Sequence, residues 1–415
     1  MTVTYPDMLR VFARIGVLSF GGPAAQIALM HRELVEERPW LSERQFLSAL
    51  GFCMLLPGPE AMQLATYCGW RLRGIPGGVT AGLLFVIPGA AFMLVLAALY
   101  ATFGAAPIAQ ALFLGIKAAV LIIVLQALLK IARKSMSDLR SRMTAALSFV
   151  AIFLFAAPFP LIIACAAVYG AIRGGGEMKP APLPERSDTL RTVAFWTVLW
   201  WAPVGALMLA GHELLTDIGL FFSKLAVVTF GGAYAVLAYM TQKVVQDQEW
   251  LTTAQMMDGL GLAETTPGPL ILVTEFVGFL AGFGSGGALL ATAAAALTLW
   301  VTFVPCFLWI FAGAPYIEWI STRPRLSAAL EAITAAVVGV ILNLSLWFAA
   351  HVFFAEVSPV NLGPLRLIVP APETVDWRTV AMAVAAGIAV FGLKWGLLRV
   401  LGASAVVGVA MSALP

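Results

Sequence analysis

Charged residues are scarce in this chain. Only 11% of its 415 residues are Asp, Glu, Lys or Arg, whereas soluble domains carry about 25%. This scarcity excludes an ordinary soluble domain. Histidine occurs three times, and the sequence has no HExxH motif and no Gly-rich phosphate loop, so the common enzyme signatures are missing. The four cysteines are isolated without a CxxC pair, which favours packing roles over a metal or redox site.

Apolar residues are abundant instead, at 61% of the chain. Long apolar runs occupy residues 79–101, 108–129, 288–312 and 326–350. Each is long enough to cross a hydrocarbon core of ~30 Å, which takes about 20 residues of helix. The alternating pattern of a membrane β-barrel is absent, and unpaired backbone groups in lipid then leave only helices. The sequence therefore predicts an all-α polytopic membrane protein.

The second half of the chain reads as a copy of the first at one constant offset, which takes position 20 to position 230. An ordered series of matches at one offset indicates duplication. Downstream the offset lengthens, because Pro88 matches Pro305, so we expect about two extra helical turns near residues 286–300. The matches at the first offset are Phe20-Gly21-Gly22 with Phe230-Gly231-Gly232, Trp40-Leu41 with Trp250-Leu251, Gln45 with Gln255, and Pro57-Gly58-Pro59 with Pro267-Gly268-Pro269.

This duplication predicts two repeats, at residues 1–172 and 212–415, joined by a cytoplasmic linker at 173–191 and a connecting transmembrane helix at 192–211. Positively charged loops face the cytoplasm, and the loop at 130–142 carries five basic residues against one acid. The uncharged loops at 103–106 and 284–286 then fall outside, and so does the long loop at 351–377. This topology takes residues 143–172 as a hairpin of two short helices. A single crossing between the copies inverts the second relative to the first, which is a transporter architecture.

Two breaks recur in each copy where an ordinary spanning helix would continue. The first is the Gly-Gly pair, and the second is a Pro-Gly-Pro tip that we expect as a hairpin tip or broken helix inside the membrane. Both expose helix N-termini, whose free N–H groups and partial positive charge suit an anion. The alternative is that Gly and Pro only allow close packing or kinks. Recurrence in both copies favours the anion site, with Gly21, Gly22, Pro57, Gly58, Pro59, Gly231, Gly232 and Gly268 as candidates.

Ionisable residues inside apolar segments are costly in lipid and usually functional. Arg14 and Lys224 each precede a Gly-Gly break by seven positions. They are candidate oxyanion partners, with anchoring at a headgroup or helix end as the alternative. Lys117, in the middle of an apolar run, needs a partner or an aqueous cavity and is a further candidate. Hydroxyls near the breaks, on Ser19, Thr229, Thr265 and Thr266, are candidate donors to the anion.

Three glutamates are candidates for coupling a proton to transport. Glu60 and Glu264 flank the two Pro-Gly-Pro tips on opposite sides, and Glu275 follows the second tip. Burial raises the pKa of such a carboxyl, which allows it to carry a proton. For Glu60 the alternative is a capping role, because it falls in the favourable first turn of a helix.

These motifs resemble those of one known family. Ser19-Phe20-Gly21-Gly22-Pro23, residues 55–65 (LLPGPEAMQLA) and residues 261–270 (GLAETTPGPL) are similar to the chromate ion transporter family in its long two-domain form. The resemblance covers nearly the whole chain, most clearly residues 11–350. It implies a multi-pass bacterial cytoplasmic-membrane protein that exports chromate, with sulfate as a competitor and halves of opposite orientation. The second break has Ala233 where the first has Pro23, so the two tips need not be equivalent.

We therefore expect a secondary transporter that exports chromate or a similar tetrahedral oxyanion, embedded in the lipid bilayer, with no cofactor, no metal and no nucleic-acid partner. A passive inorganic-anion channel and a sulfate-type oxyanion transporter are the alternatives. A membrane-embedded reductase would need a redox cofactor or paired thiols, and the sequence has the signature of neither. The oligomeric state is open, with a homodimer as one alternative.

Overall fold

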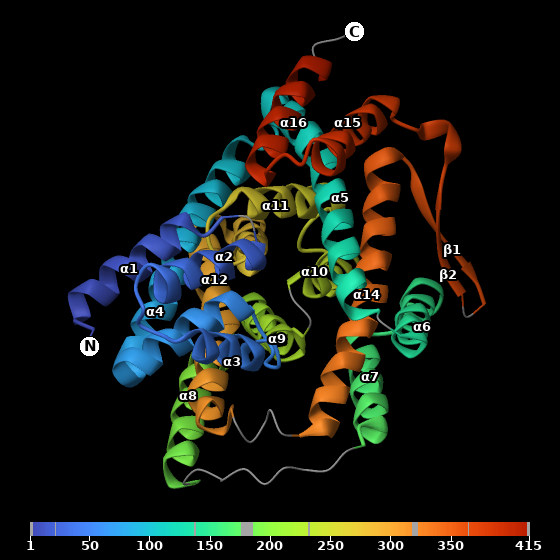
Figure 1. Ribbon diagram of the computed structural model, residues 1–415. Coiled ribbons are helices and arrows are strands. Elements are labelled where there is room, and N and C mark those ends of the chain that lie inside the picture. Colours follow the sequence, from blue (N-terminus) through green and yellow to red (C-terminus); the bar gives the residue numbers. More distant parts are fainter. Residues whose placement is uncertain are drawn as a thin grey trace. The chain divides into compact units, whose positions relative to one another are not determined.

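Figure 1 shows the computed structural model of the chain, in which residues 3–20, 22–136, 138–175, 186–230, 233–317, 323–363 and 365–412 are described. Gly21, Gly231 and Gly232 of the candidate site lie outside the described residues, as do residues 176–185 of the expected linker. Among the described residues, five helical segments are long and apolar enough to cross a membrane: Glu60–Phe103, Pro107–Ser135, Thr189–Leu209, Leu270–Tyr316 and Pro324–Phe353. The prediction of an all-α polytopic membrane protein is confirmed, with one small two-stranded sheet added.

The chain divides into two compact units, and each unit draws on both halves of the sequence. The predicted division at 1–172 and 212–415 follows the repeat and stays a prediction. Unit 1 comprises Met1–Ala98, Gly176–Ala233 and Thr266–Pro324; unit 2 comprises Leu99–Gly175, Tyr234–Thr265 and Arg325–Pro415.

Unit 1 begins with α1 (Tyr5–Leu18), an amphipathic helix. Thr4 caps it by accepting from the backbone N–H of Asp7, and a proline occupies its first turn. Its buried residues recur at helical spacing, at Met8, Val11, Phe12 and Ile15, whereas Arg14 lies on the exposed side. The unit continues with α2 (Gly22–His31), the π-helix η1 (Arg32–Glu36), α3 (Glu43–Cys53), α4 (Glu60–Phe103), α8 (Arg186–Leu209), α9 (Glu213–Val228), η3 (Leu270–Leu272), α12 (Val273–Gly313) and η4 (Ala314–Tyr316).

Capping boxes explain why Gln45 and Gln255 recur in the repeat. At the start of α3, Gln45 donates its backbone N–H to the Ser42 hydroxyl, and its side chain accepts from the Ser42 backbone. Gln255 and Thr252 form the same pair of hydrogen bonds at the start of α11 (Thr253–Thr265) in unit 2. Each repeat thus begins its equivalent helix with the same local device.

The long helices α4 and α12 each turn sharply at a glycine. Gly74 has φ 64°, and Gly287 has φ 76°. The two arms of α4, before and after the turn, lie against each other. A Cβ on Gly69 would stand 2.3 Å from the carbonyl oxygen of Gly77. The offset that relates the two Gly-Gly breaks can be applied to Gly74 and to Pro88. Gly287 lies three positions later than this offset predicts from Gly74, and Pro305 lies seven positions later than it predicts from Pro88. The extra residues of the second copy are therefore divided between both sides of its turn, and the expectation of one insertion at 286–300 was wrong.

Unit 2 is built around α5 (Pro107–Ser135) and α16 (Leu397–Ser412), which lie side by side in Figure 1. They approach closely at small residues, since a Cβ on Gly408 would stand 2.4 Å from the carbonyl oxygen of Ala111. The predicted hairpin of two short helices near residues 143–172 is present as α6 (Leu139–Phe155) and α7 (Phe159–Arg173). The remaining elements are α10 (Ala233–Thr241), the π-helix η2 (Gln242–Asp247), α11, α14 (Pro324–Phe353), β1 (Val357–Leu362), β2 (Leu365–Pro370), η5 (Pro372–Thr374), α15 (Trp377–Gly387) and η6 (Ile388–Gly392).

Two features differ from the sequence-based expectation. The connecting helix α8 begins at Arg186, so the last residues of the expected 173–191 linker are helical. The expected loop at 351–377 contains an antiparallel hairpin, in which Val357 pairs with Pro370 and Leu362 with Leu365. Its valines, leucines and isoleucine suit strands, but the prolines and the asparagine within it obscured the pattern.

Candidate functional site

The Gly-Gly breaks begin with the same backbone conformation in both halves. Ser19 ends α1 with φ −77° and ψ 67°, and Thr229 ends α9 with φ −75° and ψ 74°. These are inverse γ-turn angles. In each turn the next residue donates its N–H to the carbonyl two positions back, at 2.9 Å. The described parts of the two breaks are therefore copies of one local structure.

The Pro-Gly-Pro tip of each half is hydrogen-bonded to the Gly-Gly break of the other half, within unit 1. We call this pair of contacts the crossing. The Gly58 N–H donates to the Thr229 carbonyl at 2.8 Å, and the Gly268 N–H donates to the Ser19 carbonyl at 2.8 Å. The two donors are repeat equivalents of each other, and so are the two acceptors, which makes the contact reciprocal. The two tip N–H groups expected to face an anion are thus occupied by backbone carbonyls in this conformation.

The helices that follow the tips begin close to the predicted positions. The helix α4 starts at Glu60, directly after Pro59, so Glu60 lies in its first turn. After the second tip the chain first forms the short 3₁₀-helix η3 and then α12. Pro57 sits at the crossing too, since its carbonyl accepts from a side-chain amide described next.

Two buried glutamines bind the crossing, and sequence reasoning missed both. Gln26 Nε2 donates to the Gly268 carbonyl at 2.6 Å and to the Ser19 carbonyl at 3.3 Å. Gln63 Nε2 donates to the Pro57 carbonyl at 2.7 Å. Among the described residues neither Oε1 atom has a hydrogen-bond partner. A polar side chain in an apolar run was the available signal.

The candidate hydroxyl donors turn back onto their own helices. Ser19 Oγ donates to the Ile15 carbonyl at 2.6 Å, and Thr229 Oγ1 donates to the Leu225 carbonyl at 2.5 Å. Thr265 Oγ1 donates to the carbonyl three positions before it at 2.7 Å, and Thr266 is buried beside the second tip. Donation to an anion would therefore require the first three hydroxyls to rotate, and that role stays a prediction.

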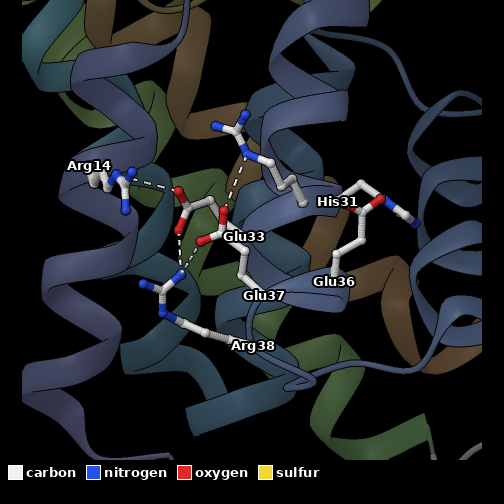
Figure 2. Close-up of polar contacts among 7 residues, drawn as sticks. Arg14, His31, Glu33, Glu36, Glu37 and Arg38 are labelled. Atoms are coloured by element: carbon white, nitrogen blue, oxygen red, sulfur yellow. Dashed lines mark hydrogen bonds and ion pairs between the residues drawn. The ribbon is translucent and has the colours of Figure 1, made fainter.

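Arg14 belongs to an ion cluster around Glu33, as Figure 2 shows. Arg14 Nε lies 3.4 Å from Glu33 Oε1, and Arg38 Nη1 donates to Glu33 Oε2 at 2.6 Å. Glu33 is fully buried, whereas the Arg14 side chain is 51% exposed. Arg14 thus has a carboxylate of η1 as its partner, and its role as an oxyanion partner stays a prediction, with anchoring as the alternative.

A second polar group follows along the same segment. His31 contacts Glu43 Oε2 through Nε2 at 2.7 Å and Glu36 Oε1 through Nδ1 at 3.1 Å (Figure 2 shows His31 and Glu36). The hydrogen bond with Glu43 raises the pKa of His31, and the charge of Glu36 adds to the effect. The residues around α2 and η1 thus form a network of paired charges.

Lys117 has a carboxylate partner within unit 2, which is one of the two alternatives that its position left open. Its Nζ lies 3.1 Å from Asp258 Oδ1, and the Tyr100 hydroxyl donates to Asp258 Oδ2 at 2.7 Å. The Asp258 side chain is 1% exposed and that of Lys117 is 17% exposed. Asp258 was missed because the helix that carries it reads as an ordinary capped helix. The position equivalent to Asp258 in the first half is Ser48.

The remaining candidates are spread over the two units. Lys224 is exposed on α9. Glu275 is buried in the first turn of α12, and within the described part of the chain its Oε2 has no hydrogen-bond partner. Glu264 is buried near the end of α11 in unit 2. The structure thus brings together Ser19, Gly58, Thr229 and Gly268, and places Lys117, Glu264 and Thr265 in the other unit.

Membrane-length apolar helices, broken segments and buried charges together define a multi-pass membrane transport protein. The chain belongs to the chromate transporter family, which it matches over residues 6–171 and 216–409. The interval between the two matched segments contains the linker and α8.

Curated relatives carry the same designation. The chromate transport protein of Cupriavidus metallidurans is 32% identical over 351 residues, covering 82% of this chain and 81% of the relative. That of Pseudomonas aeruginosa is 33% identical over 343 residues, covering 82% and 80%. A probable chromate transport protein of Synechococcus elongatus is 31% identical over 337 residues, covering 81% and 82%. No solved structure matches the chain.

Proposed function

We propose that this protein is a secondary-active exporter of chromate or a similar tetrahedral oxyanion in the bacterial cytoplasmic membrane. The names of its relatives support chromate as the substrate. The observation that carries the mechanism is the reciprocal crossing, in which Gly58 binds Thr229 and Gly268 binds Ser19.

Reciprocity of this kind is the property of a two-fold relation, in which residue i contacts j and j contacts i. The loop charges favour opposite orientations for the two halves. A two-fold axis that exchanges halves of opposite orientation lies in the membrane plane, as in inverted-repeat transporters. Alternating access then consists of one half rocking against the other around the crossing.

Helix length supports a crossing within the bilayer. Residues 60–73 form the first arm of α4, and a helix of that length spans about 21 Å. That is short of the ~30 Å hydrocarbon core. If the turn at Arg73 and Gly74 lies at the basic cytoplasmic surface, the Pro-Gly-Pro tip stops inside the membrane. Non-helical backbone at that depth is tolerated where it lines a cavity.

The groups around the crossing suit an oxyanion when the reciprocal hydrogen bonds open. The Gly58 and Gly268 N–H groups would then be free to donate, together with the amides of Gln26 and Gln63 and the first N–H groups of α4. Lys224 supplies positive charge in unit 1, and Arg14 does so if the anion replaces Glu33.

The other charged candidates keep their predicted roles in this proposal. Lys117 of unit 2 is a candidate to contact the anion along its path, because an ionisable residue inside an apolar helix is usually functional. The buried carboxyls Glu264 and Glu275 are our candidates for carrying a coupled proton, and Glu60 is the candidate at the tip.

Uptake of labelled chromate into everted membrane vesicles tests the proposal, because export then appears as accumulation. We expect saturable uptake that an imposed proton gradient or membrane potential stimulates, with competition by sulfate tested alongside molybdate. Vesicles from cells carrying the empty vector are the control. Uptake no greater than this control would refute the proposal. Currents that follow the anion gradient alone would instead identify a channel. Cross-linking of detergent-solubilised protein decides between a monomer and a homodimer.

A further inference from the structure

A polar pocket of about 550 Å³ lies in unit 2, whereas the crossing belongs to unit 1. It is lined by α6, α14, the π-helix η2 and the β1–β2 hairpin. Most buried surface of a membrane helix bundle is apolar, so a pocket with this many polar groups calls for a ligand. Its polar lining includes Thr241, Gln242, Gln246, Asn343, His351 and Arg366.

Thr241 supplies independent evidence that the pocket binds something polar. Its side chain lines the pocket and the residue is only 2% exposed. Within the described residues its Oγ1 has no hydrogen-bond partner. Buried polar groups in proteins are almost always hydrogen-bonded to protein, water or ligand. The Thr241 hydroxyl, beside the pocket, therefore lacks the partner that a buried polar group usually has.

The pocket contains one arginine that is placed to pair with an anion. Arg366 lies exposed on β2, and among the described residues it has no carboxylate within ion-pair distance. The carboxylate of Asp247, which also lines the pocket, is bound by Lys243. A guanidinium fork beside neutral amide and hydroxyl donors matches the oxygens of a tetrahedral anion.

The same part of the repeat lines a pocket in the other unit. Thr241, Gln242 and Gln246 are the repeat equivalents of His31, Arg32 and Glu36. Those three residues line a pocket of about 820 Å³ in unit 1. In both cases the wall is formed by the end of a short helix and a π-helix, and π-helical segments occur frequently at functional sites. Each repeat thus uses equivalent positions to line a pocket.

We propose that the unit 2 pocket is a second binding site for a tetrahedral oxyanion, held by Arg366, Thr241 and the amides of η2 and Asn343. Its use as the release-side site rests on the proposed function. Loop charges predict that the 351–377 segment, which carries the β-hairpin, lies on the side of the membrane away from the cytoplasm. The binding itself does not depend on transport.

Equilibrium binding of labelled sulfate and chromate to the purified full chain tests this site. Phosphatidylcholine nanodiscs are used, because their headgroups carry no net negative charge. We expect Arg366→Gln to weaken one component of binding about tenfold, the effect of losing a charge-assisted hydrogen bond. Thr241→Val should weaken the same component about threefold, and Arg366→Lys should retain part of it. Arg378→Gln is the matched control, because Arg378 is an exposed arginine on α15 that does not line the pocket.

Unchanged binding in both Arg366→Gln and Thr241→Val would overturn the site. Nanodiscs with phosphatidylglycerol form a second arm. If anionic lipid abolishes the Arg366-dependent component, the pocket holds a lipid phosphate and the free-oxyanion assignment fails. Transport separates this proposal from the proposed function. Vesicles without uptake but with Arg366-dependent binding refute the export function alone, whereas normal uptake with Arg366-independent binding refutes this site alone.

Discussion

Replacing Arg38 with glutamine tests whether a buried carboxylate holds the first π-helix in place. Arg38 donates to Glu33 at 2.6 Å, and Glu33 is completely buried. After Arg38→Gln, the 3.4 Å contact with Arg14 would be the one ion pair left to the carboxylate among the described residues. The charge would remain buried with its shorter and better-placed partner removed.

The magnitude follows from the geometry. Removing one partner of a buried ion pair destabilises by about 3–5 kcal/mol. The remaining Arg14 contact and the 34% exposure of the Arg38 side chain move the value to the lower end. We therefore expect about 2–3 kcal/mol, or a fall of about 4–12 °C in apparent melting temperature for a unit of this size.

Arg32→Gln is the matched control. Arg32 pairs with Glu37 at 3.6 Å, and both side chains are about half exposed. Surface pairs of this kind contribute at most about 1 kcal/mol. The double variant Glu33→Gln/Arg38→Gln removes the buried charge together with its partner, so it should recover at least half of the loss. The assay is the survival of monodisperse protein on size-exclusion chromatography after heating in detergent. Equal melting of the Arg38 and Arg32 variants, or a double variant less stable than Arg38→Gln, would refute the reasoning.

Three further predictions concern the crossing, the unit 2 ion pair and the histidine. Gly58→Ala should abolish chromate uptake at normal expression. Gly58 has φ 119°, and an added Cβ would lie 2.8 Å from the side-chain nitrogen of Gln63. Gly402→Ala is the control and should transport normally, because open space surrounds Gly402. Asp258→Asn should lower stability by about 2 kcal/mol by leaving Lys117 half-buried without a carboxylate, and adding Lys117→Met should recover part of this in the same melting assay. The raised pKa of His31 means that its charge stabilises the fold below the ordinary histidine pKa and that this stabilisation is lost as pH rises through the raised value. The melting difference between wild type and His31→Asn should therefore shrink between about pH 6 and pH 9, and a constant difference would contradict the assignment.

Much of the fold could be predicted from local patterns. Long apolar runs define spanning helices without reference to the rest of the chain. The repeat at one offset identified the breaks, and the glycine and prolines of the tips at 57–59 and 267–269 forced the helices to end there. A partner for Lys117 was one of two alternatives, because a lysine inside an apolar run needs either a partner or an aqueous cavity.

The identity of the partners was beyond local patterns. Asp258 and Lys117 belong to different copies of the repeat, and no periodicity links the two positions. Glu33 belongs to a run of charged residues that reads as a solvated loop, and only the fold reveals that it is buried. Gln26 looks like one polar residue in a short helix until α2 packs against the second tip. Tertiary contacts decide which polar residues are buried, and one sequence contains no direct record of them.

The two halves share backbone geometry at the crossing but differ in side-chain chemistry. The equivalent of Gln26 in the second half is Val236, and the equivalent of Glu33 is Lys243. The reciprocal hydrogen bonds need only a glycine N–H and a carbonyl from each half, so they tolerate this divergence. The side chains around the crossing carry no such constraint and are free to differ between the halves. The crossing is therefore the part of the duplication that packing preserves. The two side-chain amides that bind it, on Gln26 and Gln63, both belong to the first half. The unit 2 ion pair shows the same asymmetry, because Lys117 has Thr334 as its counterpart.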